Sequence, residues 1–201
     1  MSTENPQPIE CSVATFVMPG QSRSGDLGVV KMFEGGALLA VIDGLGHGEE
    51  AFGAAALAKA AIEAHSQETV ESLVQRCHTV LRRTRGAVMS LAAIDLEGGL
   101  LRWVGVGNVQ ALLCRFDAAA MPAREELLLR SGIVGAQLPR LCSATVPIRR
   151  RDTLIFTTDG IRSSFGDRLV ASETPRLLAQ NILNNYLQGS DDALVLVARI
   201  N

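Results

Sequence analysis

Apolar and polar residues alternate near the start of the chain, and longer apolar runs follow. Between residues 9 and 17 every second residue is apolar or β-branched, which is typical of a strand with one buried face. Residues 27–33 and 37–42 are two further β-like runs separated by an EGG segment, a composition that favours a hairpin. The second run, ALLAVI, is continuously apolar, so it predicts a central strand that is buried on both faces.

Three helices are predicted from helical spacing and from signals at the helix ends. Residues 48–65 are rich in alanine and have glutamates at the start, near the positive end of the helix dipole. Residues 68–83 place apolar side chains at intervals of three and four. The third helix begins at Thr174-Pro175, an N-cap followed by proline in the first turn, and we expect it to end at Gly189.

The rest of the chain favours strands. They are expected at residues 87–95, 100–106, 109–116, 125–129, 144–148, 153–158 and 193–200. The order of elements is strands, two helices, a block of strands, one helix and a final strand. Because this order does not repeat as βαβ units, it predicts an α+β fold with layers of mixed, largely antiparallel sheet. We expect one domain over residues 9–201, preceded by a flexible arm at residues 1–8.

Composition and charge exclude several classes of function. The chain has 201 residues, 47% of them apolar, and a formal net charge of −2, so no global field indicates a nucleic acid or an anionic membrane as partner. Its aromatic residues, six Phe, one Trp and one Tyr, are too scattered to form a stacking platform. No apolar run approaches the ~20 residues of a membrane span, and the first residues lack the features of a signal peptide. We therefore expect a cytoplasmic protein with no nucleic-acid or membrane partner.

The cysteines give no sign of chemistry. Cys11, Cys77, Cys114 and Cys142 form no CxxC pair, and each lies among apolar neighbours. This pattern predicts buried thiols that have neither a metal nor a redox role.

Four aspartates share one setting, at the end of an apolar strand and beside glycine or another small residue. They are Asp26, Asp43, Asp159 and Asp191. A carboxylate against a buried strand is costly unless it is paired, and these segments offer no matching set of basic residues. A divalent cation such as Mg²⁺ or Mn²⁺ would remove that cost, because both prefer carboxylate, carbonyl and water oxygens. Each Asp-Gly alone is equally typical of a turn, so the inference depends on the four together.

The motifs around these aspartates resemble those of a known enzyme family. DGLGHGEEA after one buried strand, TTDGI after a second and SDDA before a third resemble, in that order, the motifs of the PPM (PP2C-like) serine/threonine phosphatases. The SGD segment ahead of them is similar to the bacterial SpoIIE branch of that superfamily. The resemblance spans residues 13–200 and implies an αββα four-layer sandwich, with two mostly antiparallel sheets flanked by helices.

The resemblance also implies a site that holds two divalent cations, Mn²⁺ or Mg²⁺. It places Asp43 between both ions and the Gly44 carbonyl on one of them. Asp159 and Asp191 hold the other ion, and Asp26 lies beside the site. In the implied mechanism the ions lower the pKa of a bridging water, and the resulting hydroxide attacks phosphorus in line. No protein nucleophile is needed, in agreement with the lack of a CxxxxxR motif around any cysteine.

Several residues near these motifs leave alternatives open. Asp192 either supports Asp191 or replaces it as a ligand. Eukaryotic-type members have histidine directly after the Asp-Gly, where this chain has Leu45. His47 therefore either transfers a proton to the leaving group, caps the following helix or fixes the loop before that helix. Arg23 either binds the substrate phosphate through its guanidinium group or is a solvated loop residue.

Two further residues depart from the family pattern. Asn108 stands where eukaryotic-type members have an aspartate, which argues against the additional weak metal site that some relatives use. Leu194 replaces the usual threonine of a DDxT motif, which predicts altered hydrogen bonding around the ligands without the loss of a ligand. Neither change affects the two-ion core that the resemblance implies.

The resemblance predicts a metal-dependent protein serine/threonine phosphatase. A free-standing catalytic domain of this length is most similar to the stand-alone stressosome phosphatases of the SpoIIE branch, which implies phosphorylated STAS-domain stress-signalling proteins as substrates. The short interval between residues 160 and 190 leaves no room for a large flap, so we expect an open site that suits a folded phosphoprotein. The alternatives are a catalytically weak phosphoprotein-binding module of the same fold and a phosphatase of small phosphate esters.

Overall fold

The structure is a computed structural model and describes residues 7–117, 119–168 and 173–201. The strands in these ranges are β1 (Ile9–Phe16), β2 (Asp26–Phe33), β3 (Gly36–Gly44), β4 (Ala87–Asp95), β5 (Leu100–Val106), β6 (Gln110–Cys114), β7 (Arg124–Glu126), β8 (Leu129–Arg130), β9 (Ala144–Pro147), β10 (Thr153–Thr157) and β11 (Ala193–Ile200). The helices are α1 (Gly48–Ala64), α2 (Val70–Leu81), the 3-10 helix η1 (Ser163–Arg168) and α3 (Pro175–Tyr186).

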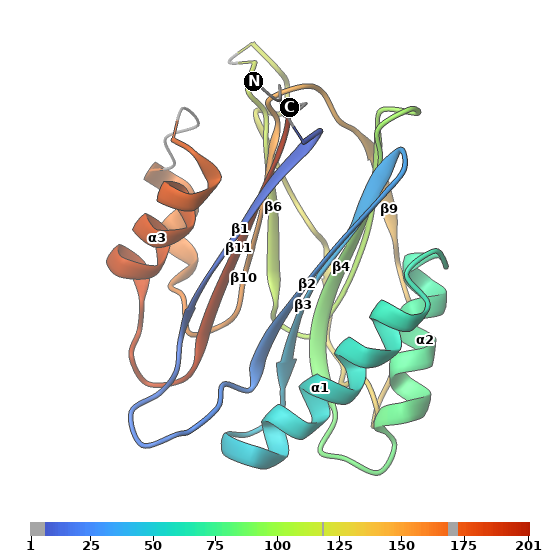
Figure 1. Cartoon of the computed structure of the whole chain (residues 1–201), viewed down its shortest axis with the longest axis vertical. Helices are drawn as coiled ribbons and strands as arrows, with labels where there is room; N and C mark the ends of the chain where they lie inside the picture. The colour runs from blue at the N-terminus through green and yellow to red at the C-terminus, as the bar shows by residue number, and fades with distance from the viewer. Residues whose placement is uncertain (1–6, 118, 169–172) are drawn as a thin grey trace, which may run out of the picture.

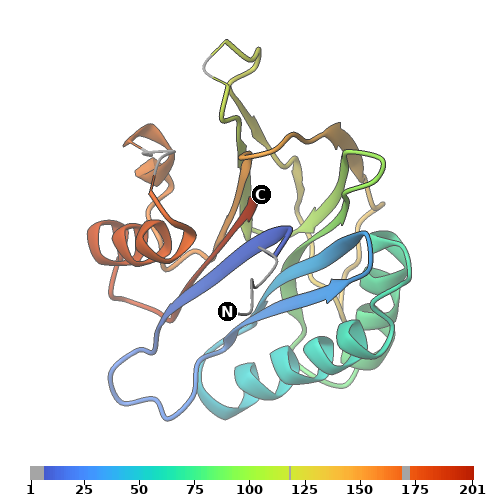
Figure 2. The ribbon, with the colours of Figure 1, turned by 45° about the horizontal axis from the view of Figure 1, so that its top comes forward.

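Two sheets pack face to face between two layers of helix (Figures 1 and 2). One sheet has the strand order β1-β11-β10-β6-β7, and the other has the order β2-β3-β4-β5-β8 with β9 also paired to β5. The pairs in both sheets are antiparallel except β5 with β8. Helices α1 and α2 cover the outer face of the second sheet, and α3 covers the outer face of the first. The expected αββα sandwich with two mostly antiparallel sheets is therefore confirmed.

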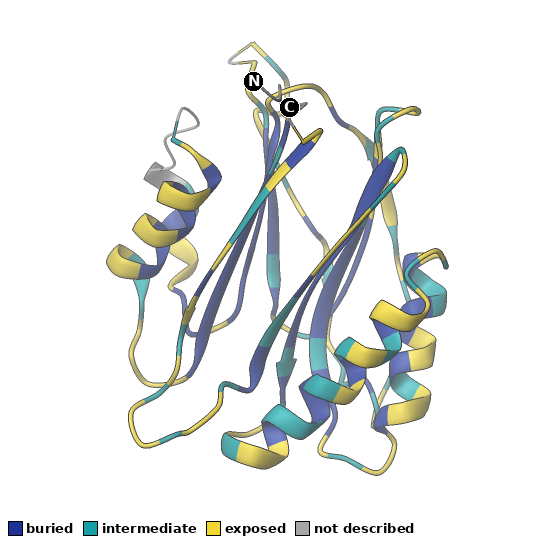
Figure 3. Ribbon diagram, in the orientation of Figure 1, coloured by how far each residue is buried: buried dark blue, intermediate teal, exposed yellow. Residues whose placement is uncertain are grey.

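The main core lies between the sheets, and alternate residues of both sheets form it. Trp103 of β5, Phe156 of β10 and Leu39 of β3 are buried there. The neighbouring β3 side chains Leu38 and Ala40 point the other way and are buried under α1 and α2. Strand β3 is therefore covered on both faces, which explains why its sequence is continuously apolar rather than alternating (Figure 3).

Strand β1 departs from the predicted single buried face. Ile9 is buried between the sheets, but Val13 on the same face is 44% exposed. Ala14, on the opposite face, is buried against α3. β1 is an edge strand of its sheet, so its inner face is only partly covered, while α3 packs on its outer face. The prediction is correct for the start of the strand and wrong for its second half.

The predicted strand at residues 125–129 is in fact two short strands in different sheets. β7 pairs with β6 in the first sheet, and β8 pairs in parallel with β5 in the second. The chain crosses between the sheets at Leu127, whose N–H donates to the carbonyl of Ala111 at 2.9 Å. A run of apolar residues does not reveal such a crossing, because it contains no information about which strand each half pairs with.

Three of the four cysteines are covered as predicted. Burial raises the pKa of the Cys77 thiol to about 12 and those of Cys11 and Cys114 to about 11, so these thiols stay protonated near neutral pH. Cys142 is exposed, which corrects the prediction that all four are buried. It lies in the irregular segment between β8 and β9, where its apolar neighbours in the sequence do not enclose it.

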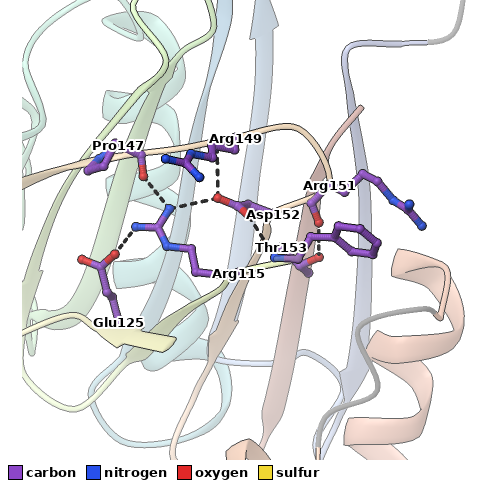
Figure 4. A network of polar contacts seen from close by, with 8 residues as sticks. Arg115, Glu125, Pro147, Arg149, Arg151, Asp152 and Thr153 are labelled. Carbon is purple, nitrogen blue, oxygen red and sulfur yellow. Dashed lines mark hydrogen bonds and ion pairs between the residues drawn. The ribbon is translucent and has the colours of Figure 1, made fainter. Parts of the chain in front are cut away.

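A buried ion-pair network closes the end of the sandwich where β11 finishes (Figure 4). Asp152 is 2% exposed and accepts a hydrogen bond from the Arg115 guanidinium at 2.9 Å. It also accepts the backbone N–H groups of Phe116 and Arg149, both at 3.0 Å. Arg115 forms a second ion pair with Glu125 of β7. This network ties β6 and β7 to the turn between β9 and β10, so Asp152 does more than form a turn.

Among the described residues no helix is both long enough and apolar enough to cross a membrane. Residues 1–6 of the predicted arm lie outside the described residues. Asn201 donates hydrogen bonds to the carbonyls of Pro8 and Gln7, at 2.9 and 2.8 Å. The single domain over residues 9–201 stays a prediction.

Candidate active site

Five aspartates come from adjoining strand ends, at the end of the sandwich opposite to the network of Figure 4 (Figure 1). Asp26 begins β2 and lies opposite Asp43 of β3 in the antiparallel register. Asp159 follows β10, and Asp191 and Asp192 precede β11. Because β10 and β11 are antiparallel, the end of the first meets the start of the second. The fold therefore brings the four predicted aspartates, together with Asp192, to one end of the molecule.

Asp192 supports the loop between β1 and β2. Its carboxylate is 4% exposed and accepts the backbone N–H of Met18 at 2.8 Å and that of Gly25 at 2.7 Å. Asp191 is exposed, and one of its oxygens accepts the N–H of Asp192 at 2.8 Å. Both oxygens of Asp192 are thus engaged by the backbone. Of the two alternatives, this geometry favours Asp191 as a ligand and Asp192 as its support.

Asp26 is held by a hydroxyl group from the other sheet. Its side chain is buried, and its Oδ2 accepts a hydrogen bond from Thr158 Oγ1 at 2.7 Å. The same hydroxyl oxygen accepts the backbone N–H of Leu194 at 2.8 Å. Sequence reasoning missed Thr158, although a threonine directly before Asp159 in TTDGI was a signal that could have found it.

Asp43 has no such partner. It is half-buried, and its carboxylate makes no hydrogen bond or ion pair with any described residue. The next residue, Gly44, donates its N–H to the Gly25 carbonyl at 3.0 Å. A Cβ at Gly44 would lie 2.0 Å from the carbonyl oxygen of Ala51, so no larger residue fits there unless α1 moves. The close approach of α1 thus fixes the backbone at Gly44, whose carbonyl is a predicted ligand.

Two of these carboxyl groups, those of Asp26 and Asp43, have raised pKa values. Burial, and then the charges of Asp26 and the other three aspartates, raise the pKa of Asp43 to about 8. The pKa of Asp26 is raised to about 7. Burial is the main cause and the charges of neighbouring aspartates add to it, whereas the hydrogen bond from Thr158 lowers the pKa. Both shifts have the sign expected of carboxylates that share a partly desolvated site without a cation.

The chemistry of this cluster fits a hard divalent cation. Carboxylate and carbonyl oxygens are the ligands that Mg²⁺ and Mn²⁺ prefer, and a divalent charge would offset the mutual repulsion of the aspartates. Within the described part of the chain, no group of three or more His, Cys, Asp or Glu side chains is arranged to hold an ion by itself. A cation here would therefore share backbone carbonyl and water oxygens, as Mg²⁺ does in most protein sites.

Asn108 holds Asp159 in place. Its Nδ2 donates a hydrogen bond to Asp159 Oδ2 at 2.9 Å. The tight turn before it depends on Gly107, which has a φ of 96° and would place a Cβ 2.2 Å from the side chain of Val88. Asn108 thus gives Asp159 a neutral hydrogen-bond donor and adds no further carboxylate to the cluster.

Arg23 and His47 lie in loops beside the cluster but do not bind its aspartates. His47 occupies the N-cap position before α1, but its side chain makes no capping hydrogen bond, which corrects the alternative that it caps this helix. Its Nδ1 is 3.4 Å from Nε2 of Gln21. The Arg23 guanidinium lies 4.5 Å from the centre of the Phe52 ring and 3.8 Å from Glu49. Neither side chain forms a hydrogen bond or ion pair with the five aspartates in the described residues. Their predicted roles therefore stay predictions.

The sequence profile of the family described as Stage II sporulation protein E (SpoIIE) matches residues 34–201. The chain belongs to the SpoIIE family. The matched part runs from the β2–β3 turn through β11, so it includes Asp43, Asp159 and Asp191 of the predicted site. Asp26 precedes the matched part and joins the site through its pairing with β3.

Named relatives agree with membership of the SpoIIE family. The phosphoserine phosphatase RsbX of Bacillus subtilis (strain 168) is 28% identical over 163 residues, which are 80% of this chain and 79% of RsbX. The crystal structure of RsbX in complex with magnesium has a TM-score of 0.85 and 25% identity, and the match covers 96% of each chain. A chain from a structural study of the bacterial stressosome has a TM-score of 0.86 and 31% identity, covering 96% of this chain and 100% of its own. The expected class, a PP2C-like serine/threonine phosphatase of the SpoIIE branch similar to RsbX, is confirmed.

The stability of this SpoIIE-family chain without metal is expected to fall as the pH rises. The pKa values of Asp43 and Asp26 in the folded state, about 8 and about 7, lie above their ordinary value of 3.8. The folded state therefore keeps protons that the unfolded state releases. The contribution of these two carboxyl groups to the free energy of unfolding is fully present below about pH 4 and is lost progressively as the pH rises to about 8. In EDTA, we expect the unfolding temperature to be roughly 5–10 °C lower at about pH 8 than at about pH 5.5.

Two thermal unfolding controls test this origin of the pH dependence. Asp43→Asn should flatten the pH profile, because it removes the carboxylate with the larger shift. Mg²⁺ at about pH 8 should restore the unfolding temperature, because a ligand that binds the folded state stabilises it. A metal-free protein that is as stable at about pH 8 as at about pH 5.5 would show that the aspartates do not repel one another as described.

Proposed function

We propose that this SpoIIE-family chain is a metal-dependent phosphatase that hydrolyses phosphoserine and phosphothreonine on STAS-domain stressosome proteins in the cytoplasm. The observation that carries the proposal is the gathering of Asp26, Asp43 and the aspartates of the β10 and β11 ends at one end of the sandwich, where burial and repulsion raise two of their pKa values. A divalent cation is the chemical partner that stabilises such a group of carboxylates. The magnesium in the RsbX structure supports the same conclusion.

In this proposal two divalent cations, Mn²⁺ or Mg²⁺, occupy the aspartate cluster. When bound, they supply the Lewis acidity that activates water for in-line attack on phosphorus and that neutralises charge on the phosphoryl oxygens. Asp43 would contact both ions, and the Gly44 carbonyl would bind one of them. Asp159 and Asp191 would bind the other ion from the first sheet, and Asp26 would be a further carboxylate of the metal site. The amide of Asn108 keeps the Asp159 carboxylate oriented.

The proposed substrate class follows from the relatives and from the exposure of the site. RsbX is described as a phosphoserine phosphatase, and another similar chain comes from a study of the stressosome. Asp159, Asp191 and His47 are exposed, so a phosphorylated side chain on a folded protein can approach them. We further propose that His47 gives a proton to the leaving group and that Arg23 binds the phosphate, both from exposed loops. We also propose that residues 9–201 form a single domain.

A phosphate-release assay on the intact chain tests the proposed function. With a phosphorylated STAS-domain protein and Mn²⁺, we expect release of phosphate that EDTA stops, and much faster turnover of this phosphoprotein than of free phosphoserine. Calorimetry on the same sample establishes that the cation is bound. No release with the cation bound would overturn the proposal. Tight binding of the phosphoprotein without turnover would favour the binding module instead, and efficient hydrolysis of free phosphoserine would favour a phosphatase of small esters.

A further inference from the structure

Thr158 joins the two halves of the aspartate cluster. It is 1% exposed and follows β10 directly. Its hydroxyl oxygen lies 2.8 Å from the backbone nitrogen of Leu194 in β11 and 2.7 Å from Oδ2 of Asp26 in β2. Its own N–H donates to the Leu194 carbonyl at 3.1 Å. One buried hydroxyl group therefore links two strands of the first sheet to an edge strand of the second.

The direction of each hydrogen bond at this hydroxyl follows from the number of protons. A backbone N–H can only donate, so the Thr158 oxygen is the acceptor from Leu194. The hydroxyl group has one proton, and that proton is left for Asp26, whose Oδ2 accepts it. Thr158 thereby fixes the position of Oδ2 of Asp26, whereas no described residue donates a hydrogen bond to Oδ1.

Asp26 needs such a partner because its neighbours repel it. It lies directly across the strand pair from Asp43, and the charges of Asp159 and Asp191 act on both. Repulsion of this kind favours side-chain rotamers that separate the carboxylates. Leu194 has no hydroxyl group with which to hold a carboxylate, but its backbone N–H orients the hydroxyl group of Thr158.

We propose that Thr158 is a positioning residue that fixes Asp26 for divalent-cation binding and thereby sets the cation affinity of the site. The proposal rests on the proposed function only in requiring that the aspartate cluster binds Mn²⁺ or Mg²⁺. Hydrogen bonds to metal-binding carboxylates orient them, and the loss of such partners typically weakens metal binding by about 10- to 100-fold. Thr158 acts through Asp26 and is not itself a ligand.

The neighbouring threonine offers a matched control. Thr157 is also buried, but its Oγ1 has no hydrogen-bond partner in the described residues. It lies within β10, where it pairs with Val195 and Gln110. Thr157→Val thus exchanges the same hydroxyl for the same methyl group, one residue away, without breaking a hydrogen bond.

Calorimetric titration of the full chain with Mn²⁺, well below the unfolding temperature, tests the proposal. We expect Thr158→Val to weaken Mn²⁺ binding by about tenfold or more, because valine has the shape of threonine but no proton for Asp26. Thr158→Ser keeps the hydroxyl group and should bind within about threefold of the original chain. Thr157→Val should leave the affinity within about twofold. Thr158→Ala, where a water can replace the hydroxyl group at Leu194, serves if Thr158→Val does not fold.

A second comparison separates positioning from a general loss of structure. In an Asp26→Ala background, Thr158→Val should not weaken Mn²⁺ binding further, because the residue through which it acts is gone. Equal weakening in both backgrounds, or unchanged binding by Thr158→Val, would overturn the proposal. Mn²⁺ binding that follows the expected pattern without phosphate release would leave the role of Thr158 intact and overturn the phosphatase function. A chain that binds no Mn²⁺ would overturn both.

Discussion

Asp43→Asn is expected to lower the rate of phosphate release from a phosphorylated STAS-domain protein by about a thousandfold at saturating Mn²⁺. Asp43 is the carboxylate that the proposal places on both cations, and it has no hydrogen bond of its own among the described residues. Asparagine keeps the size of the side chain and removes its charge, so it holds the cations less well. A thousandfold loss of rate corresponds to about 4 kcal/mol of lost transition-state stabilisation. Steady-state assays over a range of Mn²⁺ concentrations measure this loss.

The same variant should fold at least as well as the original chain, which separates loss of chemistry from loss of structure. Because burial and neighbouring aspartates raise the pKa of Asp43 to about 8, removal of its charge relieves repulsion in the metal-free protein. Asp43→Asn should therefore unfold at a higher temperature in EDTA at about pH 8. Asp95→Asn is the matched control, because Asp95 is exposed at the far end of β4 and should keep full activity. Activity of Asp43→Asn within about tenfold of the original would exclude Asp43 from the chemistry.

Asp152→Ala is expected to lower the free energy of unfolding by about 3 kcal/mol or more. The substitution leaves the buried Arg115 guanidinium with one carboxylate fewer and leaves the N–H groups of Phe116 and Arg149 without their acceptor. Arg115 keeps its ion pair with Glu125, but the loss of the more buried of its two carboxylate partners and the two unpaired N–H donors each cost free energy that no new contact returns. Urea unfolding monitored by circular dichroism measures the change, and the unfolding temperature should fall by roughly 10 °C.

Activity and a second variant show whether this effect is local. The network lies at the opposite end of the sandwich from the aspartate cluster, so the Mn²⁺ affinity and activity of folded Asp152→Ala should match those of the original chain. Asp95→Ala is the control for stability, because Asp95 also accepts two backbone N–H groups, those of Glu97 and Gly98, but in an exposed turn. We expect it to cost less than about 1 kcal/mol. Equal costs for the two variants would contradict the importance of burial at Asp152.

Local patterns in the sequence were sufficient to predict most elements. The continuous apolar run of β3 indicates a strand covered on both faces. The alanine content and the first glutamates predict α1, and helical spacing predicts α2. Thr174 caps α3 through its side chain, which accepts the N–H of Leu177, as the Thr-Pro signal predicted. These features depend on residues within a few positions of one another, so the sequence contains all the information that they need.

Errors arose where a residue depends on distant partners. The apolar segment around Leu127 has no local sign that its halves join different sheets. Asp152 looks like a turn residue until Arg115, from another strand, is placed beside it. Val13 fits the alternating pattern of β1 but lies where the edge of the sandwich leaves it exposed. In each case the missing fact was the position of a neighbour that is far away in the sequence.

The sequence by itself determined the type and order of the elements, the donor chemistry of four aspartates at strand ends and, through its motifs, the resemblance to the SpoIIE family. Only the tertiary structure decided what each carboxylate does. Asp192 is engaged by the backbone of Gly25, 167 positions away, and Asp26 is held by Thr158, 132 positions away, while Asp43 has no partner among the described residues. The physical reason is that the availability of an oxygen to a cation depends on which donors and charges surround it, and the packing of the two sheets supplies them.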